Sequence, residues 1–72
     1  EAEPGVFLWA AKEMGFTPDE CLVVEDSFSG LTAARAGGFK AIGYAPKEHN
    51  VKLLQPMSVP LLSDIREVKN FL

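Results

Sequence analysis

Two adjacent carboxylates, Glu25 and Asp26, follow the short apolar run Cys21–Val24. A run so short and so uniformly apolar is typical of a strand covered on both faces in a parallel α/β sheet. The two acids would then lie at the carboxyl end of the strand, where open α/β sheets bind their ligands. Because neighbouring acids repel each other, they favour a cation beside them, and a hard divalent ion such as Mg2+ suits their oxygen atoms.

Asp26 and Ser27 also have a second interpretation, as the N-cap of the helix that follows them. A side-chain oxygen at either position can accept a hydrogen bond from the first free N–H groups of that helix. The spacing alone does not separate a metal site from a helix cap. The two hypotheses are also compatible, because a helix N-terminus attracts anions to the same place.

The elements that must position these side chains are predicted to alternate between helices and strands. Pro4 suits the first turn of a helix, and apolar residues spaced i, i+3, i+4 and i+7 continue it until Gly15. The elements expected next are, in order, one helical turn at 17–20, a strand at 22–25, a helix at 28–36, a strand at 39–44, a polar loop at 45–49, a short helix at 50–54, a strand at 59–62 and an amphipathic helix at 65–72. This order predicts an α/β fold, a three-layer Rossmann-like parallel sheet with helices on both faces.

Single residues give a further prediction for three of these elements. Asn50 is expected to cap the short helix. Pro60 lacks the N–H group that a central strand needs, so the strand at 59–62 is predicted at an edge of the sheet. Ser63 or Asp64 is expected to cap the last helix.

Composition narrows the classes of function. The chain has 72 residues, which is enough for one small domain only. It carries no apolar run long enough to span a membrane and no signal-peptide pattern. Its single cysteine, Cys21, suits a reducing, cytoplasmic location and is interpreted as an inert thiol in the core. A net charge of −3 without a basic cluster argues against nucleic acid as a partner.

The run Glu-Asp-Ser-x-x-Gly-x-x-Ala-Ala-x-Ala-Gly at 25–37 is a specific motif. With its flanks it resembles the haloacid dehalogenase superfamily of hydrolases, and within it the β-phosphoglucomutase-like phosphatases. The resemblance is strong over residues 1–45 and weak over 46–72. It implies that residues 1–72 are the C-terminal part of the core domain of such an enzyme, without the cap domain. It also implies that the complete protein acts on a small phosphorylated metabolite.

The resemblance further implies roles for the residues of the motif. Asp26 matches the family's direct Mg2+ ligand, and Glu25 matches the neighbouring acid, which typically acts through a bound water or from outside the set of direct ligands. A metal there would offset the charge of a phosphoryl group. Ser27 is expected to cap the helix and orient the carboxylates, and it is a weaker candidate for contact with the phosphate. Gly30 is expected to allow close packing beneath the site.

The chain also departs from the family pattern. Where the family has a lysine that holds the phosphoryl group, this chain has Glu1, and of that segment only Pro4 is kept. This reversal of charge has two explanations. Either the chain is a degenerate member of the family, or its first few residues are not native to the site. The family's nucleophile lies in an Asp-x-Asp segment, which does not occur in the 72 residues. We therefore assign no catalytic residue and expect the chain alone to be inactive.

Two expectations concern the surroundings of the acid pair. The strands at 21–25 and 39–44 should be parallel neighbours, with Glu25, Asp26 and the loop at 45–50 at one end. The free edge of the first strand should pair with the remainder of the core or with another chain.

One other class of function remains open. The chain could be a non-catalytic α/β module, receiver-like or structural, whose acid pair binds a cation or caps a helix. In either class His49 and Lys47 are interpreted as solvent-facing residues.

Overall fold

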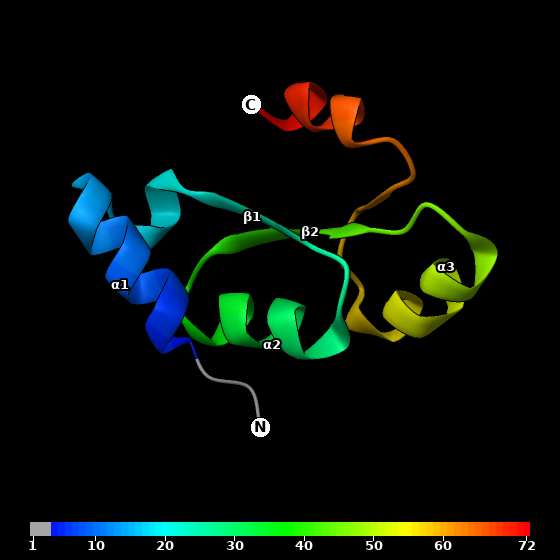
Figure 1. Cartoon of the computed structure of the whole chain (residues 1–72), viewed down its shortest axis with the longest axis horizontal. Coiled ribbons are helices and arrows are strands. Elements are labelled where there is room, and N and C mark those ends of the chain that lie inside the picture. Colours follow the sequence, from blue (N-terminus) through cyan, green and yellow to red (C-terminus); the bar gives the residue numbers. More distant parts are fainter. Residues whose placement is uncertain (1–3) are drawn as a thin grey trace.

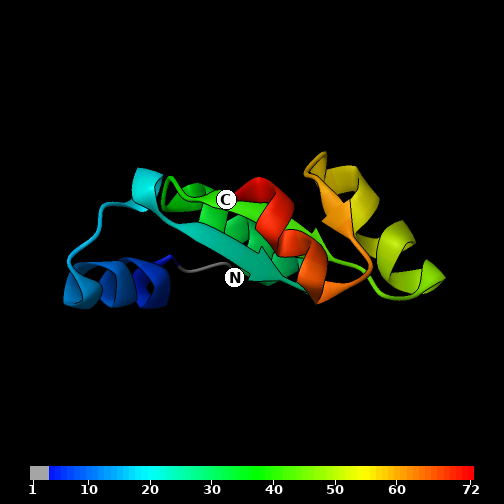
Figure 2. The ribbon, with the colours of Figure 1, turned by 90° about the horizontal axis from the view of Figure 1, so that it is seen from above.

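Helices and strands alternate along residues 4–72, which are the residues that the computed structural model describes. The elements are α1 (Gly5–Met14), η1 (Pro18–Glu20), β1 (Leu22–Glu25), α2 (Phe28–Ala36), β2 (Lys40–Tyr44), α3 (Glu48–Leu54), η2 (Gln55–Met57), β3 (Leu61–Leu62) and η3 (Ile65–Phe71), where η denotes a 3-10 helix. Helix α2 lies on one face of the sheet and η3 on the other (Figures 1 and 2). The predicted α/β class is confirmed. None of the helices in this part of the chain is long and apolar enough to cross a membrane.

The sheet is parallel and has the strand order β1-β2-β3. The register pairs Leu22 with Lys40 and Glu25 with Gly43, so β1 and β2 end side by side. Strand β3 lies at an edge of this sheet, as Pro60 predicted, but it is shorter than expected. Pro60 has no N–H group to contribute, although its carbonyl accepts a hydrogen bond from Gly43 N at 2.9 Å.

The core forms where α2 packs on the sheet. Leu31 of α2 is fully buried and packs with Leu54 and Met57. On the next turn of α2, Ala34 packs with Phe39 and with Ala11 of α1. Helix α2 therefore joins the two ends of the core and fixes the direction of β1 and β2.

Helix α1 packs on the core mainly through Ala11, and most of its other apolar side chains are partly or fully exposed. Its predicted apolar stripe is Phe7, Ala10, Ala11 and Met14, and of these only Ala11 is buried. The ring of Phe7 meets that of Phe39 edge to face, with the centroids 6.0 Å apart. Gly15 ends the helix in the left-handed conformation, as predicted.

The predicted start of the short helix was wrong. Helix α3 begins at Glu48, with Lys47 as its N-cap residue, so Glu48 and His49 are helical rather than part of a loop. Asn50 is the third residue of the helix, and its Oδ1 accepts a hydrogen bond from Lys47 N at 3.1 Å. Asn50 therefore stabilises the helix start from inside the first turn, as the glutamate of a capping box does.

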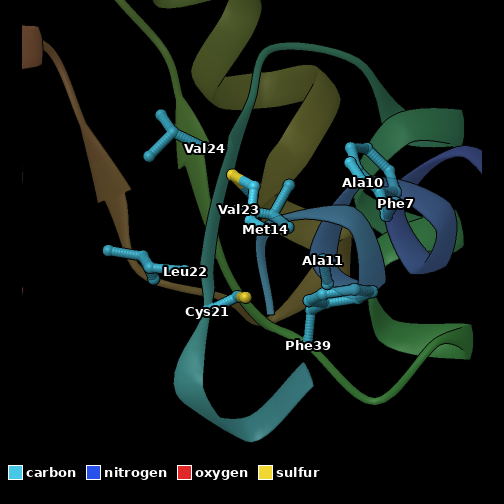
Figure 3. Close-up of a pocket in the computed structure, with 9 residues that line it drawn as sticks. All are labelled: Phe7, Ala10, Ala11, Met14, Cys21, Leu22, Val23, Val24 and Phe39. Atoms are coloured by element: carbon cyan, nitrogen blue, oxygen red, sulfur yellow. The ribbon is translucent and has the colours of Figure 1, made fainter. Parts of the chain in front are cut away.

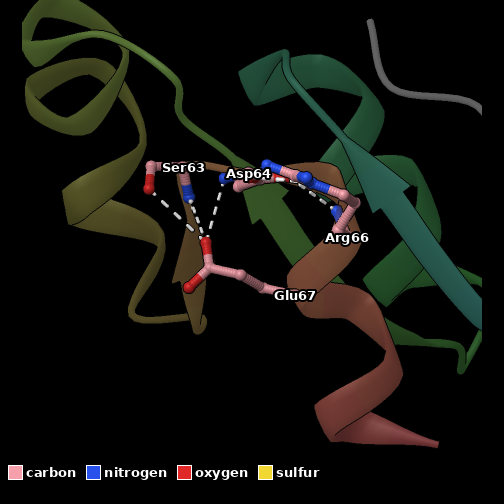
Figure 4. A network of polar contacts seen from close by, with 4 residues as sticks. All are labelled: Ser63, Asp64, Arg66 and Glu67. Atoms are coloured by element: carbon pink, nitrogen blue, oxygen red, sulfur yellow. Dashed lines mark hydrogen bonds and ion pairs between the residues drawn. The ribbon is translucent and has the colours of Figure 1, made fainter.

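The last element is a 3-10 helix and not the amphipathic α-helix that its apolar spacing predicted. Asp64 is its N-cap residue, and its carboxylate binds Arg66, which lowers the pKa of Asp64 (Figure 4). Glu67 accepts hydrogen bonds from Ser63 N and Asp64 N. Ile65 and Phe71 remain about half exposed, so little apolar packing holds this segment as a regular α-helix.

Candidate functional site

The two acids at the carboxyl end of β1 lie in different environments. Side chains alternate along a strand, and Val23 packs on the α2 side of the sheet, so Glu25 faces that side too. Glu25 is half-buried, whereas Asp26, the first residue after the strand, is exposed. The sequence placed both acids at the carboxyl end of the strand, but it did not distinguish their environments.

Ser27 is the N-cap of α2. Its Oγ accepts a hydrogen bond from Gly30 N at 3.0 Å, and its hydroxyl donates to Glu25 Oε1 at 3.2 Å. The cap is therefore Ser27 and not Asp26. Among residues 4–72, no hydrogen bond or ion pair engages the carboxylate of Asp26, which leaves its oxygens available to a ligand.

Gly30 lies on the first turn of α2, directly under the side chain of Glu25. A Cβ built on Gly30 would lie 2.5 Å from Glu25 Oε1 and 2.6 Å from Glu25 Cγ, and closer still to Cδ. No real side chain tolerates such distances, so the prediction of close packing at Gly30 is confirmed. The sequence signal for this contact is a glycine five positions after the acid, but the contact partner could not be read from it.

The end of β2 lies beside the acid pair. Because Glu25 pairs with Gly43, the segment after Tyr44 leaves the sheet next to the segment that carries Asp26 (Figure 1). The predicted parallel pairing of the two strands is therefore confirmed, but the loop expected at 45–50 is helical from Glu48 onward. Lys47 and His49 are both exposed, as expected for solvent-facing residues.

The donor atoms of the acid pair have the right chemistry for Mg2+, but the set is incomplete. Carboxylate oxygens are the ligands that Mg2+ takes from proteins, usually one or two per site, with water and substrate completing the octahedron. Within the described range 4–72, no group of three or more His, Cys, Asp or Glu side chains is placed to hold a metal. Glu25 and Asp26 thus have donor chemistry that fits Mg2+, and among residues 4–72 no third side chain of these types completes a site with them.

An apolar groove runs between α1 and β1, and neither Glu25 nor Asp26 is among the residues that line it (Figure 3). Its volume is about 260 Å³. It is lined by Phe7, Ala10, Ala11 and Met14 of α1, by Cys21, Leu22, Val23 and Val24, and by Phe39. Cys21 is only half-buried there, so the interpretation of a thiol enclosed in the core was too strong. Sequence reasoning gave the apolar stripe on α1 but not the groove beside it.

Comparison with known proteins gives matches to parts of longer chains. No family model matches. A phosphoglycolate phosphatase from Nitrosococcus oceani is 32% identical over 73 residues, which cover 96% of this chain and 31% of that protein. A β-phosphoglucomutase from Mycobacterium bovis is 49% identical over 39 residues, which cover 54% of this chain and 15% of that protein.

One solved structure matches the fold. It is a conserved haloacid dehalogenase-like protein of unknown function from Agrobacterium tumefaciens, with a TM-score of 0.84 and 30% sequence identity. The match covers 96% of this chain and 33% of that protein. The chain thus spans about a third of the solved structure and of the phosphoglycolate phosphatase. Sequence and structure together confirm the resemblance that the motif at 25–37 suggested.

Proposed function

We propose that this haloacid dehalogenase-like chain is the Mg2+-binding portion of a phosphatase or phosphomutase that acts on a small phosphorylated metabolite. The observation that carries the proposal is the arrangement at the end of β1. There Asp26 is exposed without a partner in residues 4–72, and Glu25 is held by Ser27. The similarity to a phosphoglycolate phosphatase and to a β-phosphoglucomutase supports the reaction class.

The two acids would have unequal roles. Asp26 would bind the metal directly, because its carboxylate is free and open to solvent. Glu25 would act through a bound water, because the Ser27 hydroxyl and the first turn of α2 already restrain its carboxylate. When bound, Mg2+ offsets the negative charge of a phosphoryl group.

The covalent step would need a nucleophile from outside this chain. A phosphatase of this type uses a carboxylate as nucleophile, and none of the acids in the chain occurs in an Asp-x-Asp segment. We therefore expect the chain alone to bind the metal weakly and to turn over no substrate.

The groove between α1 and β1 gives the remainder of the core a place to bind. In the described sheet β1 is paired only with β2, so its other edge can accept a further strand. The groove beside β1 is apolar and about 260 Å³ in volume. A segment that added a parallel strand there would bury the exposed side chain of Met14 and bring its own carboxyl end next to Asp26.

A hybrid enzyme tests this proposal. The chain replaces the residues that it matches in the Nitrosococcus oceani phosphoglycolate phosphatase, with Glu1→Lys to restore the charge that the family has there. We expect Mg2+-dependent hydrolysis of p-nitrophenyl phosphate. Asp26→Ala should lower kcat/KM by about 100-fold or more, and Glu25→Ala by about tenfold. The matched control is Glu13→Ala, an exposed acid on α1, which should leave kcat/KM within about twofold.

The alternative, a non-catalytic module, makes the opposite prediction for the same hybrid. If the acid pair serves only the fold, a folded hybrid stays inactive, or its activity does not respond to Asp26→Ala. A larger loss for Glu25→Ala than for Asp26→Ala would reverse the roles proposed for the two acids.

A further inference from the structure

The position of the Glu25 carboxylate depends on the absence of a side chain at position 30 of α2. Glu25 leaves β1 on the side of the sheet that α2 covers, and the first turn of α2 passes beneath it. At the point of contact α2 has Gly30, so the carboxylate lies in the space that a side chain at position 30 would fill. Every other amino acid would place a Cβ there.

We infer that Gly30 is a positioning residue for the acid pair, acting through Glu25. It leaves the space in which Ser27 can hold the Glu25 carboxylate against α2, so that Asp26 alone remains free as a direct ligand. This inference rests on the proposed function, because it holds that the placement of the Glu25 carboxylate serves Mg2+ binding by the acid pair.

The hydrogen bonds around Ser27 support a fixed placement. A hydroxyl has one proton to donate, and the Ser27 proton goes to Glu25 Oε1, while its oxygen accepts from Gly30 N. Both bonds use the same oxygen atom, so the N-terminus of α2 and the Glu25 carboxylate share one anchor. The helix terminus also favours a negative charge at this point.

An alanine at position 30 would move Glu25 rather than the backbone. The atoms that its Cβ would meet, Cγ, Cδ and Oε1 of Glu25, belong to a flexible side chain that can rotate away. Rotation would break the hydrogen bond to Ser27 and return the carboxylate to solvent. Gly30→Ala is therefore a specific perturbation of Glu25 within an otherwise intact fold.

A double-mutant cycle in the chain, measured without metal, tests the contact. Gly30→Ala is introduced into the wild type and into Glu25→Ala, and the thermal unfolding midpoint of each variant is recorded by circular dichroism. Alanine favours a helix over glycine, so Gly30→Ala should raise the midpoint where Glu25 is absent. In the wild type the displaced carboxylate should cancel that gain, leaving a difference of about 4 °C or more between the two backgrounds. The matched control is Ser29→Ala, an exposed residue on the same turn, whose effect should be the same in both backgrounds.

Mg2+ binding tests whether the placement of the Glu25 carboxylate serves the metal site. Titration of the chain with MgCl2, followed through the amide resonance of Asp26, should give an affinity about tenfold weaker for Gly30→Ala than for the wild type. Ser29→Ala should not change this affinity. Glu25→Ala should weaken it to a similar extent, and Gly30→Ala should add nothing further in that background.

The outcomes separate the two claims. Equal effects of Gly30→Ala on the midpoint in both backgrounds would overturn the positioning role. A difference in the midpoint without a change in Mg2+ affinity would show that the placement does not serve the metal, which also overturns the inference. If Mg2+ does not shift the Asp26 amide of the wild type, the proposed metal site itself fails. The metal-free cycle then still decides whether Gly30 positions Glu25.

Discussion

Replacing Ser27 with alanine removes two hydrogen bonds at once, the cap of α2 and the anchor of Glu25. The loss of a serine N-cap costs about 1 kcal/mol of the free energy of unfolding. The bond from Ser27 Oγ to Glu25 Oε1 is 3.2 Å long and only partly buried, so it should contribute about 0.5–1 kcal/mol. The total is about 1.5–2 kcal/mol, which corresponds to a fall of about 10 °C in the unfolding midpoint of a domain of this size.

Thermal unfolding followed by far-ultraviolet circular dichroism measures the Ser27→Ala effect, and the two contributions can be separated. Ser27→Ala in a Glu25→Ala background should cost only the capping share, about 1 kcal/mol. Ser27→Thr keeps a hydroxyl and should recover at least half of the loss. A midpoint for Ser27→Ala within about 2 °C of the wild type would refute the assignment of Ser27 as the common anchor.

Three further predictions concern the whole chain. The isolated 72-residue chain should not hydrolyse p-nitrophenyl phosphate with added Mg2+, and a turnover that disappears in Asp26→Ala would contradict this. Leu31→Ala should lower the free energy of unfolding by about 2–5 kcal/mol, because Leu31 is fully buried and packs with Leu54. Urea unfolding measures this loss, and a value below about 1 kcal/mol would mean that the core collapses around the smaller side chain. The free edge of β1 should cause self-association in sedimentation experiments, whereas a monodisperse monomer with slow amide exchange throughout Leu22–Val24 would show that this edge is covered.

The elements around the acid pair could be predicted because several local signals agreed there. The apolar run before Glu25 indicated a strand, Ser27 indicated a helix start and the pair Gly37 and Gly38 indicated its end, and the structure has β1 and α2 within those bounds. Asn50 was misplaced because the same side chain can bind the backbone from the cap position or from the first turn. No local pattern separates these two cases.

The remaining differences depend on tertiary contacts. The apolar spacing after Asp64 predicted an α-helix, but spacing does not reveal whether a surface is present to pack against, and Phe71 is about half exposed. The same limit applies to the site. Adjacent acids and a glycine can be read from the chain, but the rotamer that brings Glu25 over Gly30 exists only once α2 has docked on the sheet.

The pairing of β1 with β2 across a single helix has a consequence for the order of folding. Leu22 and Lys40 pair on either side of α2, so a parallel sheet begins here with a short loop to close and a small loss of chain entropy. We therefore expect the unit formed by β1, α2 and β2 to form early in folding. A strand arriving at the other edge of β1 from a distant segment must close a far longer loop. It would join late, on a surface that α1 and β1 have already shaped.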